Sequence, residues 1–497
     1  MGPIFDVLGL EQGGVSSSDE YKLYNNEQLS SAQRSNLGVS IRNVTISSIG
    51  LADDAILISN DITHLQCLLY LTVQYCNKYE VELVPEKTKL LAFSNVNDKI
   101  FLNYVKLISP ISLNNERIEF SDEAEHVGIL RSTSGGNLPN IVERISAHNK
   151  ALSSVLPAGL ALHHHANPAA GLHVEQLHAL PVLLSGLSAL VLSKYEINLI
   201  SSHYKNTLLR LMKLHERTPD CVVFFLAGSL PGSALLHLRQ LSLFGMICRL
   251  DGNILKTMAL KTLVEAKPAA NSWFQQIRDL CIQYQLPHPI ALLETPPLKT
   301  RFKKLCELKV NEYWHSKFTI ESKLPSLKFL HPNFLSLTTT HPIWSSLNGN
   351  PYQTLKAKTQ ARFFSGRFRT ESLCRFWSDN KEGVCLLDSC RGLHITEDLE
   401  HIVVSCAGLT ETRRRLTRFT TDYIADKPIL KPLIAAYLCS TQDLFMQFII
   451  DCSILPLVIA SYQKYGPTIY EHLFHISRTW CYSLDCDRSK LLGRYRK

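Results

Sequence analysis

The stretch Leu51-Ala52-Asp53-Asp54 lies between two strand-like runs, residues 44–49 and 55–59. Apolar and β-branched runs that flank a short polar segment are typical of a β-hairpin, so we expect both carboxylates at a hairpin tip. Adjacent carboxylates repel each other, and a divalent cation such as Mg²⁺, which prefers hard oxygen ligands, would remove that repulsion. An isolated Asp-Asp pair is more often only a polar turn, so the surrounding sequence has to decide.

The segments around this stretch indicate a mixed region of strands and helices that is followed by helices alone. Strand-like runs recur at 90–93 and 106–108, and residues 62–78 have the pattern of a helix. Beyond about residue 140, apolar side chains recur at helical spacing. One such stripe contains Ile197, Ile200, Tyr204, Leu208 and Leu211. We therefore predict the α+β class.

Four motifs follow one another along the first 131 residues. They are Glu11-Gln12-Gly13-Gly14-Val15-Ser16-Ser17, the Asp53-Asp54 pair, Val81-Glu82-Leu83-Val84-Pro85-Glu86-Lys87-Thr88-Lys89 and Ala124-Glu125-His126-Val127-Gly128-Ile129. In this order and at these separations, they resemble the reverse transcriptase of LINE-type (non-LTR) retrotransposons. The segment Leu180-Pro181-Val182-Leu183-Leu184-Ser185-Gly186 is similar to the thumb region of those proteins. The resemblance covers nearly the whole chain.

The resemblance implies an RNA-directed DNA polymerase, a nucleotidyltransferase that binds an RNA template, a DNA primer or target, and deoxynucleoside triphosphates. By this resemblance Asp53 and Asp54 bind Mg²⁺, and Lys87 donates a proton to pyrophosphate. It also implies that substrate or template contacts come from Gln12, Gly13, Gly14, Ser17 and Gly128. Two metal ions at such a site activate a 3′-hydroxyl and stabilise the departing pyrophosphate.

Two departures from the family pattern bear on activity. Leu51 stands where the family usually has Phe or Tyr. Only eleven residues precede Gln12, although the family's first catalytic aspartate lies some tens of residues before this motif. Two-metal catalysis needs carboxylates from separate strands, so we expect this chain to be inactive by itself.

Two other functions remain open. The first is a non-catalytic nucleic-acid-binding remnant that uses the thumb, a zinc element and a basic tail. The second is a metal phosphohydrolase built on the Asp pair, but the sequence lacks the histidines that such sites usually place around the carboxylates.

Three cysteines and a histidine form the pattern Cys385-x4-Cys390-x10-His401-x4-Cys406. Three thiolates and one imidazole suit Zn²⁺ in a closed tetrahedral site, which has no open position for catalysis. The resembling proteins carry a similar Cys-Cys-His-Cys element after the thumb. The alternative is a set of unrelated buried cysteines beside a surface histidine, and Cys374 and His394 are spare candidates.

A basic run follows the cysteine–histidine pattern at Arg413, Arg414 and Arg415. Arginines beside a zinc element suit contacts with nucleic-acid phosphates, which do not depend on base sequence. An ordinary solvated helix face explains the run equally well. Weaker candidates are His163-His164-His165 for metal and the basic residues of 299–304, around Phe302, for nucleic acid.

The predicted organisation has five segments. They are a partial palm with the catalytic hairpin and the primer grip (1–131), a helical thumb (132–265), a helical connector (266–375), a zinc-knuckle-like Cys/His element (376–410) and a helical basic tail (411–497). The predicted fold is thus an α+β partial reverse-transcriptase palm followed by a helical thumb, a helical connector, a small Cys/His element and a helical tail.

The composition argues against a secreted or membrane-embedded protein. The 497 residues carry a formal net charge of +8, and 14 cysteines are scattered without the dense spacing of a small disulfide-stabilised domain. The first residues lack the pattern of a signal peptide, and no apolar run has the length and purity of a bilayer span. We expect an intracellular protein of the nucleus or cytoplasm that has no membrane partner.

Overall fold

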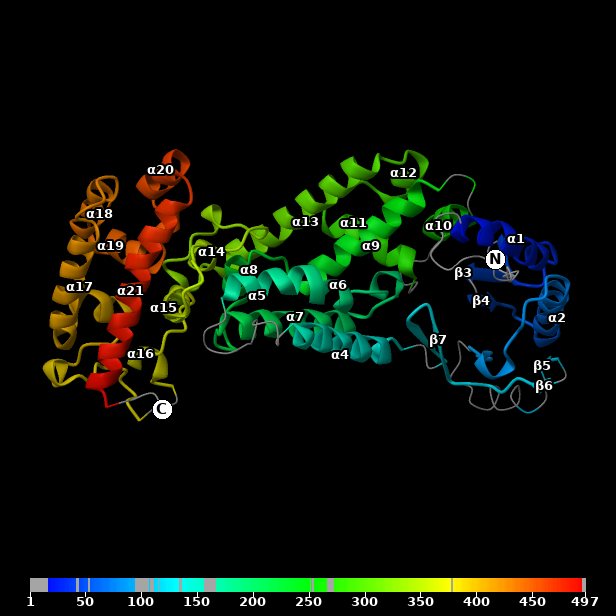
Figure 1. Ribbon diagram of the computed structural model, residues 1–497, viewed down its shortest axis with the longest axis horizontal. Coiled ribbons are helices and arrows are strands. Elements are labelled where there is room, and N and C mark those ends of the chain that lie inside the picture. Colours follow the sequence, from blue (N-terminus) through cyan, green and yellow to red (C-terminus); the bar gives the residue numbers. More distant parts are fainter. Residues whose placement is uncertain are drawn as a thin grey trace, which may run out of the picture. The chain divides into compact units, whose positions relative to one another are not determined.

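The computed structural model describes residues 17–41, 44–51, 54–93, 107, 111–114, 116–133, 136–155, 167–250, 252, 254–265, 272–376 and 379–493. The structure is 65% helical, and the strands of its described part form four small two-stranded sheets. This content is compatible with the predicted α+β class. The chain divides into two compact units, and each unit is assembled from several chain segments (Figure 1).

The first unit contains residues 1–143, 186–192 and 240–302. Its helices are α1 (Ser17–Arg34), α2 (Ile62–Lys78), α10 (Ile254–Glu265), α11 (Trp273–Gln283) and α12 (Pro289–Glu294), with short helical turns η1 (Pro85–Lys87) and η4 (Leu187–Ala189). Its antiparallel strand pairs are β1 (Val39–Ile41) with β2 (Val44–Ile46), β3 (Ser48–Leu51) with β4 (Asp54–Leu57), β5 (Ser112–Leu113) with β6 (Glu116–Arg117) and β7 (Glu123–His126) with β8 (Ile129–Ser132). Three helices have residues in both units, namely α4 (Leu138–Ser154), α9 (Gly232–Cys248) and α13 (Lys299–Glu321).

The β3–β4 and β7–β8 pairs are the two hairpins expected from the motifs. Leu51 pairs with Asp54, so this hairpin turns over two residues. The second hairpin turns at Val127 and Gly128, whose φ angles are 56° and 68°. Positive φ at both turn residues is the geometry that matches the twist of the flanking strands, and glycine adopts it without steric penalty.

Other predicted strands differ from the structure. The run 44–49 is divided at Ser47 into β2, which pairs with β1, and β3, which pairs with β4, and the Ser47 N–H donates to the Gln33 side-chain oxygen at 3.4 Å instead of to a strand. The predicted strand 90–93 is reduced to one isolated bridge between Leu90 and Phe120. In the predicted strand 106–108, Leu107 is helical and its neighbours lie outside the described residues. Short apolar runs do not distinguish strand from helix by periodicity.

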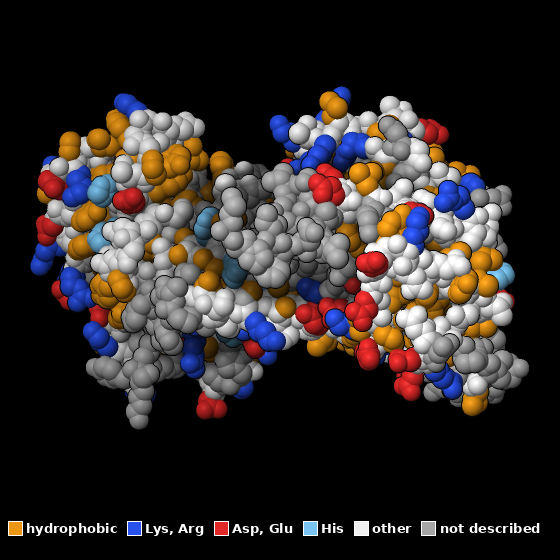
Figure 2. All heavy atoms as spheres, turned by 45° about the vertical axis from the view of Figure 1, so that its right-hand side comes forward, with side chains coloured by type: hydrophobic (Ala, Val, Ile, Leu, Met, Phe, Trp, Pro, Cys, Tyr) orange, Lys and Arg blue, Asp and Glu red, His pale blue; other side chains and the backbone are white. Residues whose placement is uncertain are grey.

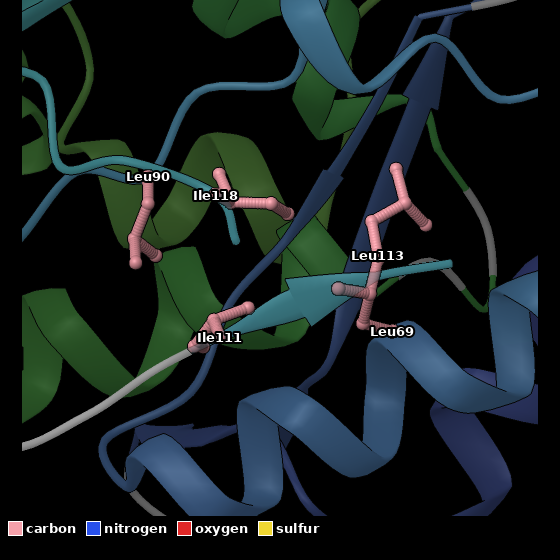
Figure 3. Packing of buried hydrophobic residues seen from close by; sticks show 5 residues of the cluster. All are labelled: Leu69, Leu90, Ile111, Leu113 and Ile118. Carbon is pink, nitrogen blue, oxygen red and sulfur yellow. The ribbon is translucent and has the colours of Figure 1, made fainter. Parts of the chain in front are cut away.

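The core of the first unit's sheet region is a cluster of five buried aliphatic side chains (Figure 3). They are Leu69, Leu90, Ile111, Leu113 and Ile118. Helix α2 supplies Leu69 and covers the predicted range 62–78. It begins there because the Asp61 carboxylate accepts hydrogen bonds from the backbone N–H groups of Thr63 and His64. Such a cap satisfies N–H groups that have no partner within the helix.

The second unit contains residues 144–185, 193–239 and 303–497. Its helices are α5 (Pro168–Val174), α6 (Leu180–Leu183), α7 (Lys194–Met212), α8 (Asp220–Ala227), α14 (Pro342–Ser345), α15 (Pro351–Phe364), α16 (Glu371–Cys374), α17 (Thr410–Tyr423), α18 (Leu430–Leu438), α19 (Gln442–Ile450), α20 (Pro456–Tyr465) and α21 (Thr468–Leu491). The described part of this unit also contains two π-helical turns, η3 (Glu175–Ala179) and η8 (His401–Ser405). It further contains five 3-10 turns, which are η5 (Pro325–Leu327), η6 (Pro332–Phe334), η7 (Asp388–Cys390), η9 (Ala407–Leu409) and η10 (Cys452–Ile454).

Helix α7 confirms the predicted apolar stripe. Ile200, Tyr204 and Leu208 are fully buried, and the helix begins with a capping box between Ser193 and Glu196. No single helix of the described residues is long and apolar enough to cross a bilayer. Helices α8 and α9 would pass that test only as a pair, bent by 63°, and every residue of α8 except the first is buried.

The C-terminal helix α21 is the centre of the last part of the second unit. It packs against α15, α17, α19 and α20, and Phe474, Trp480 and Leu484 are buried along it. The Trp480 indole N–H donates to the Thr420 hydroxyl of α17 at 3.0 Å. The residues that follow the cysteine–histidine pattern therefore form part of the same core as the residues that precede it.

Candidate metal centre

The side chains of Cys385, Cys390, His401 and Cys406 converge on one point. Their potential ligand atoms lie within 4.8 Å of one another, and all four residues are buried. The Sγ atom of Cys390 lies 3.7 Å from His401 Nε2 and 3.7 Å from Cys406 Sγ, and Cys385 Sγ lies 4.0 Å from Cys406 Sγ. Such a cluster could bind a metal ion such as zinc.

These distances distinguish a metal site from a disulfide. A disulfide joins two sulfurs at about 2.05 Å, and the sulfurs here are nearly twice as far apart. In a tetrahedral Zn²⁺ site with Zn–S bonds of about 2.3 Å, two sulfurs lie about 3.8 Å apart. The observed sulfur–sulfur distances of 3.7 Å and 4.0 Å agree with that value. The four residues therefore fit a closed Cys₃His zinc site.

A short antiparallel segment holds Cys385. Its N–H donates to the Ile395 carbonyl at 2.9 Å, and the preceding Val384 forms a β-bridge with Thr396. The turn into this segment requires Gly383, whose φ is +67° and where a Cβ would lie 2.8 Å from the Ser372 Cα. Backbone pairing and the Gly383 turn thus position the first ligand.

The spacing His401-x4-Cys406 corresponds to one π-helical turn. The Cys406 N–H donates to the His401 carbonyl at 2.7 Å, which is the i→i+5 bond that defines this turn. The turn begins where the Asp398 carboxylate accepts the His401 N–H at 2.8 Å. One local hydrogen bond therefore brings two ligands to the same place. Cys390 closes the separate 3-10 turn η7 and donates its N–H to the Leu387 carbonyl at 2.8 Å.

Groups around the ligands orient them. The Leu387 N–H hydrogen-bonds the Cys385 sulfur, and the Gly408 N–H hydrogen-bonds the Cys406 sulfur, so each of these cysteines is contacted by the amide two residues later. The Ser405 hydroxyl lies 3.3 Å from His401 Nδ1. A hydrogen bond there leaves the Nε2 lone pair to a metal ion, and such outer partners set both ring orientation and ligand basicity.

The electrostatics of the cluster favour a thiolate at Cys406, whereas the hydrogen bond to Cys406 and burial raise the pKa of the Cys385 thiol well above its usual value. A hydrogen bond from the Cys385 thiol, assisted by Cys390, the His401 charge and the Gly408 N–H, lowers the pKa of Cys406 to about 5. Arg413 donates from Nη2 to the Cys406 carbonyl at 2.6 Å and stands close enough to interact with the charges of Cys406 and Cys390. Three thiolates around one Zn²⁺ leave a net charge of −1, which the Arg413 guanidinium offsets.

No family model, curated protein or solved structure matches the chain. The functional assignment therefore depends on what the residues of the chain can do in this geometry.

The structure describes part of the predicted polymerase site. Asp54 is the exposed first residue of β4, and it belongs to no group of three potential metal ligands in the described part of the chain. Mg²⁺ binding thus has no support from the structure. Ser17 begins α1, Lys87 is exposed at the end of η1, and Gly128 lies in the β7–β8 turn. Asp53, Gln12, Gly13 and Gly14 lie outside the described residues.

The three predicted phosphate-binding arginines have different surroundings. Arg413 is turned towards the metal centre, whereas Arg414 is exposed beside Glu411, with 3.5 Å between Arg414 Nη1 and Glu411 Oε2. Arg415 forms an exposed ion pair of 2.6 Å with Asp487 of α21. On the face drawn in Figure 2, the described basic, acidic and hydrophobic side chains are interspersed rather than segregated by charge.

The weaker candidates do not join the metal centre. Cys374 is buried elsewhere and His394 is exposed with its Nδ1 3.2 Å from Glu382 Oε2, while His163-His164-His165 lies outside the described residues. Phe302 is buried and so does not present its ring for stacking, although Lys299, Arg301 and Lys303 around it are exposed.

Sequence analysis did not identify Arg488 as part of the site's surroundings. This arginine of α21 is buried and contacts Glu397 and Glu371, which precede His401 by four and thirty residues along the chain. No local spacing pattern connects residues that are 91 and 117 positions apart, as Arg488 is from Glu397 and Glu371.

Proposed function

We propose that this chain belongs to a LINE-type reverse transcriptase, and that its residues 385–406 form a zinc element that binds nucleic acid. The observation that carries the proposal is the convergence of Cys385, Cys390, His401 and Cys406, because their spacing predicts a Cys₃His zinc site and the resembling proteins carry a similar Cys-Cys-His-Cys element. The hairpins at Asp54 and at Gly128 and the helices that follow them are compatible with the same ancestry.

The zinc element's chemistry is structural. Three thiolates and an imidazole fill all four positions of a tetrahedral Zn²⁺ ion, so no position remains for a water or a substrate. When bound, the ion would hold the segments that carry the ligands in a fixed arrangement. The residues of this chain then present the exposed side of α17, with Arg414 and Arg418, to phosphates.

Two measurements test this function. We expect purified protein to contain about one zinc ion per chain by elemental analysis, and Cys390→Ser to remove it. We expect the zinc-loaded protein to bind single-stranded RNA and DNA of different sequences with similar affinity and a steep salt dependence. Protein without zinc, or zinc-loaded protein without measurable nucleic-acid binding, would contradict the proposal.

The second candidate is a nucleic-acid-binding remnant without polymerase activity. The observation that favours it is that the metal ligands in the described part of the chain gather at a closed site, whereas Asp54 contributes one exposed carboxylate from one hairpin. Two-metal phosphoryl transfer needs carboxylates from separate strands. We expect no primer extension on an RNA template in Mg²⁺. Template-dependent incorporation that Asp54→Ala abolishes would establish the polymerase instead.

A further inference from the structure

Arg488 is a buried cation on the C-terminal helix α21. Only 3% of this residue is exposed, and its guanidinium contacts the Glu397 carboxylate through two nitrogens. Nε donates to Oε2 at 3.1 Å, and Nη2 donates to Oε1 at 2.5 Å. Two parallel charge-assisted hydrogen bonds fix direction as well as distance. Glu397 is fully buried, so its charge depends on this partner.

A second buried carboxylate joins the same guanidinium. Arg488 Nη2 lies 3.6 Å from Glu371 Oε1, and the Glu371 N–H donates to Glu397 Oε1 at 2.8 Å. Glu371 Oε2 accepts a hydrogen bond from Asn380 Nδ2 at 3.3 Å, and the same amide group donates to the Val384 carbonyl at 2.8 Å. One arginine therefore links α16, the turn before Cys385 and the segment that contains Glu397.

These linked segments are the ones that carry metal ligands. The Glu397 N–H donates to the Gly383 carbonyl at 3.0 Å, which closes the antiparallel segment that holds Cys385. The next residue, Asp398, caps the π-helical turn that delivers His401 and Cys406. The backbone of Glu397 thus lies between the support of the first ligand and the support of the last two.

We propose that Arg488 is a positioning residue for the metal centre, so that helix α21, which supplies no ligand, is part of the metal-binding module. This inference rests on the proposed metal binding. Without Arg488, two buried carboxylates would lose the cation that holds them together, and the two ligand-bearing segments would no longer be fixed relative to each other. The four ligands would remain in the sequence, but fewer molecules would present them at tetrahedral distances.

The chain provides a matched control on the same helix. Arg415 of α17 pairs with Asp487, the residue before Arg488, at 2.6 Å. The Arg415 side chain is 60% exposed, so its ion pair is screened by water and contributes little to stability. Arg415→Met and Arg488→Met each remove a guanidinium that holds the same turn of α21. Of these two arginines, only Arg488 contacts the segments that carry ligands.

The experiment measures metal binding by the full-length chain and its variants. Zinc affinity is measured by competition with a chromophoric chelator, and the ligand geometry by the d–d absorption of the Co²⁺-substituted protein. We expect Arg488→Met to lower zinc affinity by about ten-fold or more, as loss of a supporting outer contact does in other metal sites. The Co²⁺ bands should broaden in this variant, whereas Arg415→Met should match the wild type in both measurements.

Two further variants keep the test decisive if Arg488→Met does not fold. Arg488→Lys retains the charge but not the two-pronged contact, so we expect an intermediate affinity. The double variant Glu397→Gln with Arg488→Met removes a buried carboxylate together with its partner, so it should lose less affinity than Arg488→Met.

The possible outcomes separate the two proposals. A wild-type chain that takes up no zinc refutes the proposed metal binding. A wild-type chain that binds zinc while Arg488→Met and Arg488→Lys bind it equally well, with unchanged Co²⁺ bands, overturns the role of Arg488. That role is likewise overturned if Arg488→Met lowers only the thermal unfolding temperature and leaves zinc affinity unchanged.

Discussion

The imidazole of His148 and the carboxylate of Glu175 form a hydrogen bond of 2.8 Å between two side chains that are completely buried in the second unit. The other ring nitrogen of His148, Nδ1, lies 3.0 Å from Nε2 of His203. Hydrogen bonds thus connect Glu175 of the π-helical turn η3 to His148 of α4, and His148 to His203 of α7. Only one proton fits between the two rings.

Stability should therefore decrease in mild acid. Burial, together with the neighbouring charges of His148 and Arg210, lowers the pKa of His203 to about 4, whereas an unfolded histidine has a pKa of about 6.5. Between these values the unfolded chain binds more protons than the folded chain, so stability is lost as the pH falls from about 6.5 towards 4. We expect His203 to contribute about 1 kcal/mol after allowance for its partial exposure.

The measurement is the thermal midpoint between pH 7.5 and pH 5. Burial also lowers the pKa values of His237 and His475 to about 4. The free energy of unfolding of the whole chain should therefore fall by more than the contribution of His203 alone. His203→Gln should flatten the pH dependence in part. A midpoint that rises on acidification, or an unchanged slope in His203→Gln, would contradict this prediction.

Removal of zinc should loosen residues 385–406 and spare the first unit. Binding free energy at structural zinc sites is folding free energy, on the order of 10 kcal/mol in zinc-finger peptides. We expect a chelator to make the Arg391 loop sensitive to trypsin, because this exposed arginine lies between Cys390 and His401. The core around Leu113 and Leu69 should keep its hydrogen-exchange protection, and equal loss in both regions would count against separate cores.

Gly408→Ala should weaken metal binding through a steric contact. A Cβ at this position would lie 2.9 Å from Leu387 Cδ1 and 3.1 Å from Leu387 Cβ. Relief of this overlap would displace the Gly408 N–H from the Cys406 sulfur, so we expect zinc affinity to fall about ten-fold. Leu387→Ala combined with Gly408→Ala should recover part of the loss. If the single variant binds zinc like the wild type, the close packing is not needed.

Two arginines of the basic run, Arg413 and Arg414, should have different functions. Arg413→Met removes the cation beside the thiolates and should lower zinc affinity. Arg414→Met should leave the metal unchanged and weaken nucleic-acid binding about equally for all sequences, because phosphate contacts carry no sequence information. Chelator competition and fluorescence anisotropy at several salt concentrations measure the two effects. Equal effects of both variants on zinc affinity would exclude this division.

Local sequence patterns predicted the parts of the structure that depend on neighbours along the chain. The apolar spacing and the Asp61 cap give helix α2 its bounds, and the hairpin at Asp54 follows from polar residues between two apolar runs. The ligand set of the metal centre also followed from spacing, since His401 and Cys406 share one helical turn. The reverse-transcriptase ancestry stays a prediction, because no finding tests it.

Contacts between distant segments were beyond such reasoning. The predicted strand 44–49 is divided at Ser47 because the residues before it pair with β1 and the residues after it pair with β4. Arg488 acquires its role only when α21 packs beside Glu397, a residue 91 positions earlier. Neither residue differs in type or spacing from ordinary surface sequence, and only the folded chain reveals their partners.

Chain segments of the two units alternate along the sequence, and this order determines when all residues of each unit become available during synthesis. The first unit needs residues 186–192 and 240–302 in addition to residues 1–143, and residues 144–185 and 193–239 between them belong to the second unit. Synthesis as far as residue 143 therefore supplies only part of the residues that form the first unit's core. Pairings over such sequence separations form slowly, and unfinished hydrophobic surface favours aggregation. We expect nascent chains whose synthesis has reached residue 143 or 265 to require chaperones, and chains that extend beyond residue 302 to be the first that contain all residues of the first unit.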